Sequence, residues 1–387
     1  MPRIGIVKSG SPQPWDIPLL KKILDLGSEA SFICSSSASL QVPFRRAVSL
    51  RSFSIVDRLI RGKLGWSLNK FFKYSAYDSF SRYISPKKAF KDFDYLVFGD
   101  DAYSLPNQAV KTKSNFGVIV WENIPYHYQY EYIRPIKNSR TNVLKHASHI
   151  FPVSRDAGKC LEEDWIRQDK VHLVHPGIDT DFFSPGEITN NLGIKEELIR
   201  NNTIISSSRI TYNKGITYIL RAMSILKRRN VKINYLAAGQ INPEFGDYCK
   251  RLVGKLGIED QVTFLGKVDY HSLVNLYRMG DLFLFPSIPT LLWEEQMGYA
   301  LIESQSCGLP AVRSDSTSLG EVSPETFSRP VPPGNPEKLA DAIQILIEDP
   351  LLRSRLGKES RDYVNKNYNV LETAKSYIKY SSEYSRT

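Results

Sequence analysis

Arg209 and Lys214 lie five residues apart in a short segment that follows a predicted strand over Thr203–Ser207 and opens a predicted helix. A guanidinium can form two parallel hydrogen bonds to a phosphate, and an ammonium acts on a phosphate as a point charge. Because a tight turn separates the two side chains, they could converge on one diphosphate. Basic residues at helix starts are also common as solvated surface groups, so this pair alone does not distinguish a ligand site from an ordinary surface.

Glu295 and Glu303 form a second candidate pair, eight residues apart, after a predicted strand over Leu282–Phe285. Glu295 would precede a helix and Glu303 would lie two turns along it. One carboxylate could then accept hydrogen bonds from a sugar and the other from the two hydroxyls of a ribose. Gly298 would let a ligand approach the helix N-terminus, whose N–H groups suit phosphate. The alternative is that both carboxylates only complement the helix dipole.

Strands must position these side chains, and the chain alternates short apolar runs with helical patterns, as βαβ units on parallel sheets do. Ligands of open α/β sheets bind beyond the carboxyl ends of the strands, which is where both candidate pairs lie. The first half predicts strands at Ile4–Val7, Ala30–Cys34, Tyr95–Phe98, Gly117–Trp121, His149–Val153 and Val171–Val174. The second half adds Thr203–Ser207, Ile233–Ala237, Val262–Leu265, Leu282–Phe285 and Ala311–Val312.

One helix can be checked in detail, because its apolar residues recur with helical spacing and basic residues follow at 227–229, where they complement the helix dipole. This pattern predicts an amphipathic helix whose apolar stripe belongs to a core. The stripe consists of Ile216, Ile219, Leu220, Met223 and Leu226.

The composition is that of a globular protein of 387 residues, 42% hydrophobic and 24% charged, which suggests two domains rather than one large core. No run approaches the roughly 18 apolar residues of a membrane span, and no leader pattern precedes the first strand, so we expect no spanning helix and no secretion. The four cysteines lie far apart without metal-ligand spacing, which predicts neither a disulfide framework nor a metal site.

The positive charge of the chain is concentrated at its start. Residues 1–91 hold 16 Lys and Arg against 5 Asp and Glu, and the other 296 residues are close to neutral. This basic segment has three interpretations: a solvated face, a surface that contacts anionic membrane, or a nucleic-acid site. The second would gain about 1 kcal/mol per cation, whereas no nucleic-acid-binding motif supports the third. Its basic residues include Arg45, Arg46, Arg51, Arg58, Arg61, Lys63, Lys70 and Lys73.

A polar segment between the two halves contains turn residues and no strand pattern, which predicts a linker over 181–202. The expected organisation is a Rossmann-like N-terminal domain over 1–180, the linker, a second Rossmann-like domain over 203–368, and a C-terminal helix within 369–387. We expect this last helix to pack back on the first domain.

In their order along the chain, the motifs resemble those of the family 4 (GT4) retaining glycosyltransferases of the GT-B fold, over about residues 140–385. The first 110 residues match only as a generic Rossmann-like half. A segment at 176–183 is similar to the interdomain signature of that family. The other motifs are Ser208-Arg209, Lys214-Gly215, Phe264-Leu265-Gly266, Pro286-Ser287, Glu295 with Glu303, Gly308 to Val312, and Gly320-Glu321.

The resemblance implies an α/β protein of the GT-B type: two Rossmann-like, doubly wound parallel-sheet domains facing a cleft, with the donor on the second and the acceptor on the first. Arg209 and Lys214 would neutralise the donor diphosphate. Glu303 would hold the ribose and Glu295 would contact the transferred sugar, so the implied catalytic residues are Glu295, Arg209 and Lys214. The backbone that cradles phosphate or sugar would be that of Gly298, Tyr299 and Ala300.

The implied reaction transfers a sugar from a UDP- or GDP-sugar to an acceptor hydroxyl with retained anomeric configuration, without a metal or other cofactor. The acceptor could be a lipid-linked or polysaccharide intermediate, handled in the cytoplasm at the inner membrane face. Alternatives from other classes are a nucleotide-sugar epimerase or a phosphorylase on the same fold, and a non-catalytic basic adaptor for membrane or nucleic acid.

Among the departures from the family pattern, one concerns a candidate site residue. The family commonly places a histidine after a strand of the N-terminal half, where it contacts the sugar, and this chain has Glu122 and His127 near that position. Either residue could take the role, and the sequence leaves the choice open.

Overall fold

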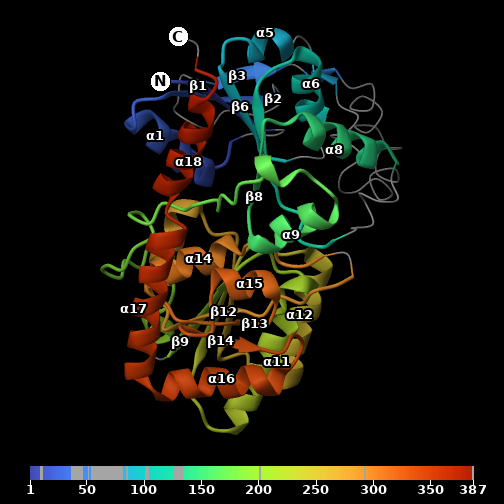
Figure 1. Cartoon of the computed structure of the whole chain (residues 1–387). Coiled ribbons are helices and arrows are strands. Elements are labelled where there is room, and N and C mark those ends of the chain that lie inside the picture. Colours follow the sequence, from blue (N-terminus) through green and yellow to red (C-terminus); the bar gives the residue numbers. More distant parts are fainter. Residues whose placement is uncertain are drawn as a thin grey trace. The chain divides into compact units, whose positions relative to one another are not determined.

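The computed structural model of the chain contains two compact units (Figure 1). It describes residues 1–8, 12–35, 47–50, 52–53, 82–83, 86–100, 104–125, 134–199, 202–291 and 293–385. The first unit consists of Met1–Gly177 together with Val370–Thr387, and the second unit is Ile178–Asn369. None of the helices in these ranges is long and apolar enough to cross a bilayer.

A six-stranded parallel sheet forms the centre of the first unit, with the strand order β3-β2-β1-β6-β7-β8. Its strands are β1 (Arg3–Lys8), β2 (Glu29–Ser35), β3 (Ala47–Leu50), β6 (Tyr95–Phe98), β7 (Phe116–Val120) and β8 (His149–Pro152), and β4 (Ser52–Phe53) pairs with β5 (Arg82–Tyr83) separately. Its helices are α1 (Ile17–Asp25), α5 (Pro86–Phe90), α6 (Ser104–Thr112), α8 (Arg134–His146), α9 (Arg155–Glu163) and α18 (Val370–Ser382).

The second unit repeats this plan with the order β11-β10-β9-β12-β13-β14. Its strands are β9 (Thr203–Ser207), β10 (Asn234–Ala238), β11 (Val262–Gly266), β12 (Leu282–Phe285), β13 (Ala311–Ser314) and β14 (Ser328–Val331). Its helices are α10 (Glu196–Ile199), α11 (Ile216–Arg228), α12 (Pro243–Leu256), α13 (Leu273–Arg278), α14 (Tyr299–Ser306), α15 (Thr317–Val322), α16 (Pro336–Glu348) and α17 (Pro350–Asn367). The prediction of two doubly wound parallel sheets is confirmed.

Both sheets reverse their strand order once, between β1 and β6 in the first unit and between β9 and β12 in the second. The central pairs run parallel, with Ile4 opposite Tyr95 and Ile204 opposite Leu282. In a doubly wound sheet such a reversal is the topological switch point, beside which ligands bind. Each unit therefore has one such point at the carboxyl ends of its central strands.

The predicted apolar stripe of α11 is confirmed as core, because all five of its side chains have no exposed surface. The edges of the sheets were harder to predict. Ser328–Val331 forms the edge strand β14 although Pro330 removes a backbone donor, which is tolerated where a strand has one neighbour only. The predicted strand Val171–Val174 is wrong, because that segment forms a single bridge from Val171 to Ile150.

The last helix, α18, packs against α1 in the first unit (Figure 1). Ala374 and Tyr377 are buried in the same apolar cluster as Ile4, Ile6 and Leu20. The hydroxyl of Thr373 accepts a hydrogen bond from the Gly177 N–H and donates one to the His175 carbonyl, at 2.9 Å each. Residues from the two ends of the chain thus build one core.

The segment predicted as a linker, 181–202, differs from that expectation because it belongs to the second unit. Phe183 is fully buried, its ring lies 5.9 Å from that of Tyr277, and its carbonyl accepts a hydrogen bond from the Ser306 hydroxyl at 2.6 Å. Ile194 is buried as well, and Glu196–Ile199 forms a one-turn helix. These apolar anchors fix a segment whose polar composition suggested a free connection.

Gly215 joins the turn after β9 to α11, and substituting it should destabilise the second unit. Its φ is +71°, and an added Cβ would lie 2.0 Å from the carbonyl oxygen of Pro286. Gly257 has a similar φ of +64° with no atom within 4 Å of that position, so it is the matched control. Gly257→Ala should cost about 1 kcal/mol from backbone strain alone. Gly215→Ala should cost clearly more in urea unfolding, and equal costs would contradict the close approach to Pro286.

Candidate active site

The candidate residues of the second unit lie in two loops at its switch point. One loop follows β9 and spans 208–215, and the other follows β12 and spans 286–298. The loops are joined directly, because the Ile288 N–H donates to the Asn213 carbonyl at 2.8 Å and Gly215 packs against the Pro286 carbonyl. Neighbouring parallel strands thus bring together residues about 80 positions apart in the sequence.

Lys214 and Glu295 form an ion pair between Nζ and Oε2, and their side chains are only 10% and 14% exposed. The same Oε2 accepts a hydrogen bond from the Ser287 hydroxyl at 3.1 Å. The ammonium lies 4.8 Å from the Trp293 ring centroid and 5.5 Å from that of Phe285, within the range of cation–π attraction. A cation and a carboxylate are therefore held together where little water reaches them.

Ser287 is itself fixed by a hydrogen bond from the neighbouring strand β13. Its carbonyl accepts a hydrogen bond from the Ser314 hydroxyl at the end of β13, and both serines are buried. This chain of contacts links the Glu295 carboxylate to the sheet through two side chains. A carboxylate fixed in this way keeps its orientation when a ligand arrives.

Arg209 is exposed on the loop after β9. The loop backbone is fixed, because the Ile210 N–H donates to the Gln240 carbonyl at 2.9 Å. It also packs closely on the next strand, since any side chain at position 239 in place of glycine would collide with the Ser208 carbonyl. Within the described part of the chain, the guanidinium has no ion-pair partner. The structure therefore pairs Lys214 with Glu295 and leaves Arg209 facing solvent.

Glu303 lies on α14 and is buried, with an exposed fraction of 5%. The Tyr277 hydroxyl donates a hydrogen bond to Oε2 at 3.0 Å. Burial raises the pKa of Glu303 from 4.5 to about 8, and the hydrogen bond from Tyr277 opposes this shift. Before a ligand binds, the carboxyl is therefore mainly protonated at neutral pH.

The start of α14 carries the other predicted ligand-binding residues. Gly298 precedes the helix with a φ of +65°, and an added Cβ would lie 2.9 Å from the Phe285 ring. Tyr299 and Ala300 form the first turn, where backbone N–H groups are not used by the helix itself. Glycine at 298 lets this turn lie against the end of β12, beside the loop that holds Glu295.

Sequence reasoning missed three of these participants. Tyr277 lies on α13, 26 residues before Glu303, and no local pattern connects the two. Trp293 and Ser314 were not assigned a role, although each contacts the site through Lys214 or Ser287. The position of Trp293 two residues before Glu295 was the one signal that could have suggested it.

Of the two alternatives for the family's histidine, the structure describes Glu122. Glu122 follows β7, is 9% exposed, and accepts a hydrogen bond from the Ile124 N–H at 2.8 Å. His127 lies outside the described residues, as do the basic residues between Arg45 and Lys73. A role of Glu122 or His127 at the sugar therefore stays a prediction. Contact of the basic segment with membrane stays a prediction as well.

No cluster of three or more His, Cys, Asp or Glu side chains that could hold a metal ion occurs among the residues that the structure describes. The four cysteines are buried and unpaired. Burial raises the pKa of Cys160 and Cys307 to about 12, so these two thiols stay protonated at neutral pH.

Residues 190–363 match the family model described as glycosyl transferases group 1. The chain is 29% identical over 222 residues to an uncharacterized glycosyltransferase of Methanocaldococcus jannaschii, which covers 54% of this chain and 53% of that protein. It is also 29% identical over 221 residues to D-inositol 3-phosphate glycosyltransferase of Mycolicibacterium smegmatis, covering 56% and 49%. The chain thus matches about half the length of these curated relatives, and the match to the group 1 glycosyl transferase model falls within its second unit.

Two solved structures have the same fold along their whole length. HepE of Anabaena in complex with UDP superposes with a TM-score of 0.77 at 13% identity, covering 99% of this chain and 100% of that one. Sucrose-phosphate synthase of Thermosynechococcus elongatus gives a TM-score of 0.73 at 18% identity and covers 99% of both chains. The predicted GT-B fold is confirmed.

The raised pKa of Glu303 should make the stability of the protein depend on pH. The unfolded chain loses this proton near pH 4.5, whereas the native state keeps it up to about pH 8. The unfolded state therefore binds fewer protons between these values, and native stability falls as pH rises through them. Wild type should lose free energy of unfolding relative to Glu303→Gln between pH 5 and 8, measured by urea unfolding.

The control for this experiment is Glu244→Gln, which changes an exposed glutamate on α12. It should follow wild type at every pH. Parallel curves for wild type and Glu303→Gln would show that Glu303 is ionised in the native state.

Proposed function

We propose that the chain is a retaining glycosyltransferase that moves a sugar from a nucleotide-diphosphate sugar to an acceptor hydroxyl. The observation that carries the proposal is the desolvated Lys214–Glu295 pair at the switch point of a group 1 glycosyltransferase domain, beside the start of α14. The pair provides a cation for a phosphate and a carboxylate for sugar hydroxyls within one ligand's reach.

Negative charge grows on the departing diphosphate as the bond to the sugar breaks. Cations already fixed in a site with little water stabilise this charge better than water does, because they need not reorganise. When the donor binds, before the bond to the sugar breaks, Lys214 would leave Glu295 for a phosphate oxygen, and Arg209 would bind the same diphosphate from the solvent side. Glu295, still held by Ser287, would then accept hydrogen bonds from the sugar.

Glu303 would bind the ribose of the donor. A carboxylate accepts hydrogen bonds from both hydroxyls of a diol, whereas a protonated carboxyl has fewer acceptor positions. Binding of the ribose would therefore favour the ionised form of Glu303. The ribose hydroxyls would replace the water that burial removes from this carboxylate. The backbone of Gly298, Tyr299 and Ala300 would contact phosphate or sugar at the start of α14.

The nucleotide is proposed as uridine or guanosine diphosphate. The structure of HepE contains UDP, and a relative from Corynebacterium glutamicum is named as a GDP-mannose-dependent mannosyltransferase. We further propose that the first unit binds the acceptor, a lipid-linked or polysaccharide intermediate, at the cytoplasmic membrane face. The motifs favour no metal ion and no other cofactor.

Other activities on this fold would leave different products. A nucleotide-sugar epimerase would release no nucleoside diphosphate, and a phosphorylase would require inorganic phosphate. A non-catalytic adaptor would bind polyanions without a saturable nucleotide site. The pairing of Glu295 with Lys214 favours a transferase over an adaptor, because desolvating an ion pair costs free energy of folding and a role in binding the donor accounts for keeping it.

Nucleotide binding is the first test of this proposal. One of UDP, GDP and ADP should raise the melting temperature without added metal, since a ligand at a hundred times its Kd stabilises the native state by about 2.7 kcal/mol. The shift should be lost in Glu303→Ala and kept in Glu244→Ala, measured by differential scanning fluorimetry. If none of the three nucleotides shifts the melting temperature, the adaptor becomes the better explanation.

Arg209 should contribute to catalysis without contributing to stability, because its side chain is exposed. Arg209→Ala should lower kcat for release of nucleoside diphosphate from the donor by about 10²–10³, the usual effect of removing one group that stabilises transition-state charge. The control is Arg228→Ala, an exposed arginine at the end of α11. Full activity in a folded Arg209→Ala variant would remove Arg209 from the mechanism.

A further inference from the structure

The Tyr277 hydroxyl lies in the interior of the second unit and contacts two other polar side chains. It donates a hydrogen bond to Oε2 of Glu303 at 3.0 Å, and the Ser207 hydroxyl forms a hydrogen bond with it in turn. Ser207 is the last residue of β9, directly before the loop that carries Arg209 and Lys214. A continuous chain of hydrogen bonds therefore connects the end of β9 to the carboxyl on α14.

Aromatic packing fixes the direction of this hydroxyl. Tyr277 has no exposed surface, and its ring centroid lies 5.8 Å from that of Phe283 on β12 and 5.9 Å from that of Phe183. The ring planes of Tyr277 and Phe283 meet at 81°, an edge-to-face arrangement that favours one orientation. The hydroxyl therefore holds one oxygen of Glu303 in place and restricts rotation of the carboxyl.

The charged groups around Glu303 do not neutralise it. Arg278 on α13 and Arg361 on α17 donate to backbone carbonyls, and among the described residues no cation forms an ion pair with Glu303. Cys307, one turn further along α14, stays protonated because burial raises the pKa of its thiol to about 12. The strands β9 and β12 add no titratable side chain. Tyr277 is thus the group that acts on this carboxyl most directly.

The hydrogen bond from Tyr277 is compatible with both forms of Glu303, since a carboxyl and a carboxylate can each accept at Oε2. The bond to the carboxylate is the stronger one, because the acceptor is then ionised. Burial and the neighbouring carboxyl raise the pKa of Tyr277 well above its usual value of 10, so the hydroxyl keeps its own proton. Tyr277 therefore favours the form of Glu303 that accepts hydrogen bonds from a diol.

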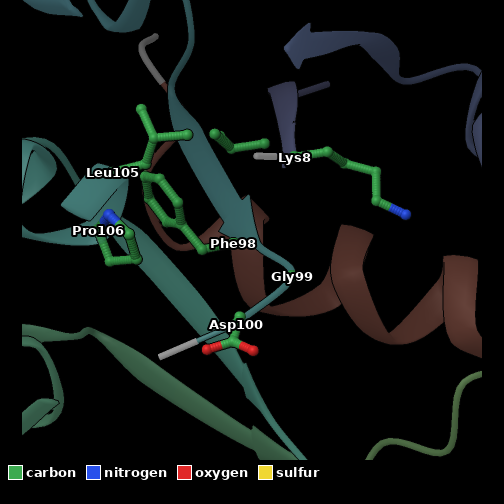
Figure 2. A pocket seen from close by; sticks show the side chains of 7 residues that line it. Lys8, Phe98, Gly99, Asp100, Leu105 and Pro106 are labelled. Carbon is green, nitrogen blue, oxygen red and sulfur yellow. The ribbon is translucent and has the colours of Figure 1, made fainter. Parts of the chain in front are cut away.

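A position at a switch point does not by itself require such support. At the switch point of the first unit, Asp100 follows β6 and lines a pocket of about 220 Å³ together with Lys8 (Figure 2). That side chain is only half-buried, so water reaches its carboxylate. Almost no water reaches Glu303, and a buried carboxylate without a cation needs another source of stabilisation.

We propose that Tyr277 is a positioning residue for the donor and makes nucleotide binding depend on pH. Its hydroxyl orients the Glu303 carboxyl toward the ribose, and it supports the carboxylate once the ribose hydroxyls bind. The proton of Glu303 leaves to solvent in this step, while Tyr277 keeps its own. The inference rests on the proposed function, because it requires a ribose at Glu303.

The first measurement counts protons in the wild-type chain and needs no variant. Isothermal titration calorimetry with UDP and GDP at pH 7.5, in Tris and in HEPES, gives the number of protons released per bound nucleotide. The 2′,3′-dideoxy form of the same nucleotide has the same diphosphate but no diol, so it is the reference. The nucleotide should release a larger fraction of a proton than its dideoxy form. Its affinity should rise with pH and level off above about pH 8, where Glu303 is already ionised.

The second measurement uses Tyr277→Phe, which removes the hydroxyl and keeps the ring. This variant should bind the nucleotide about tenfold more weakly at pH 7.5, as expected for loss of a hydrogen bond to a charged group. The rise of affinity should move to higher pH, because Tyr277 no longer opposes the effect of burial on the pKa of Glu303. The dideoxy nucleotide should bind wild type and Tyr277→Phe equally.

The matched control is Tyr235→Phe. Tyr235 is also fully buried, and its hydroxyl lies 2.7 Å from that of Ser206, the residue before Ser207 on β9. Because this hydroxyl does not contact Glu303, the control should bind nucleotide as wild type does at every pH. Melting temperatures of both variants show whether each one is folded.

Three results would overturn the inference while the donor site stands. They are equal proton release by the nucleotide and its dideoxy form, equal losses of affinity in Tyr277→Phe and Tyr235→Phe, and a loss in Tyr277→Phe that persists with the dideoxy nucleotide. If wild type binds neither UDP nor GDP, the proposed donor site fails for these nucleotides, and the inference fails with it.

Discussion

The reversal of strand order between β9 and β12 determines where chemistry can occur in the second unit. The connection after β9 leads to β10 on one side, and the connection after β12 leads to β13 on the other. Because crossovers between parallel strands are right-handed, these two connections leave toward opposite faces of the sheet. The loops separate at this point, and the exposed strand ends between them can hold a ligand. Every residue proposed to contact the donor lies on these two loops or on α14, which follows the second loop.

Electrostatics then shapes what this position can bind. Lys214 and Glu295 neutralise each other in a site with little water, so neither charge is left buried alone. Among the described residues no cation forms an ion pair with Glu303; burial instead raises its pKa to about 8, and the Tyr277 hydroxyl donates a hydrogen bond to it. The two glutamates, which look alike in the sequence, therefore differ in how burial is compensated: Glu295 forms an ion pair with Lys214, and Glu303 has a raised pKa.

The repeated αβ pattern and the α11 stripe could be predicted because they depend on neighbours within a few residues. The proximity of Lys214 and Glu295 could be predicted as well, since the two residues follow adjacent central strands. The contact of Tyr277 with Glu303 could not be predicted, because it depends on how α13 and α14 pack. The expectation of a linker over 181–202 has a related explanation. The burial of one aromatic ring, Phe183, attaches this segment to the second unit although most residues around it are polar.

The second unit is inserted between two parts of the first, and its two ends lie side by side. Ile178 pairs with Asn369, and the Ile178 N–H donates to the Tyr368 carbonyl at 2.8 Å. During synthesis, all residues of the second unit leave the ribosome before α18 does. The apolar surface of the first unit around Ile4 and Leu20 must therefore wait for α18 to cover it. The unit translated first is thus the last to complete its core, which reverses the usual order of folding along a nascent chain.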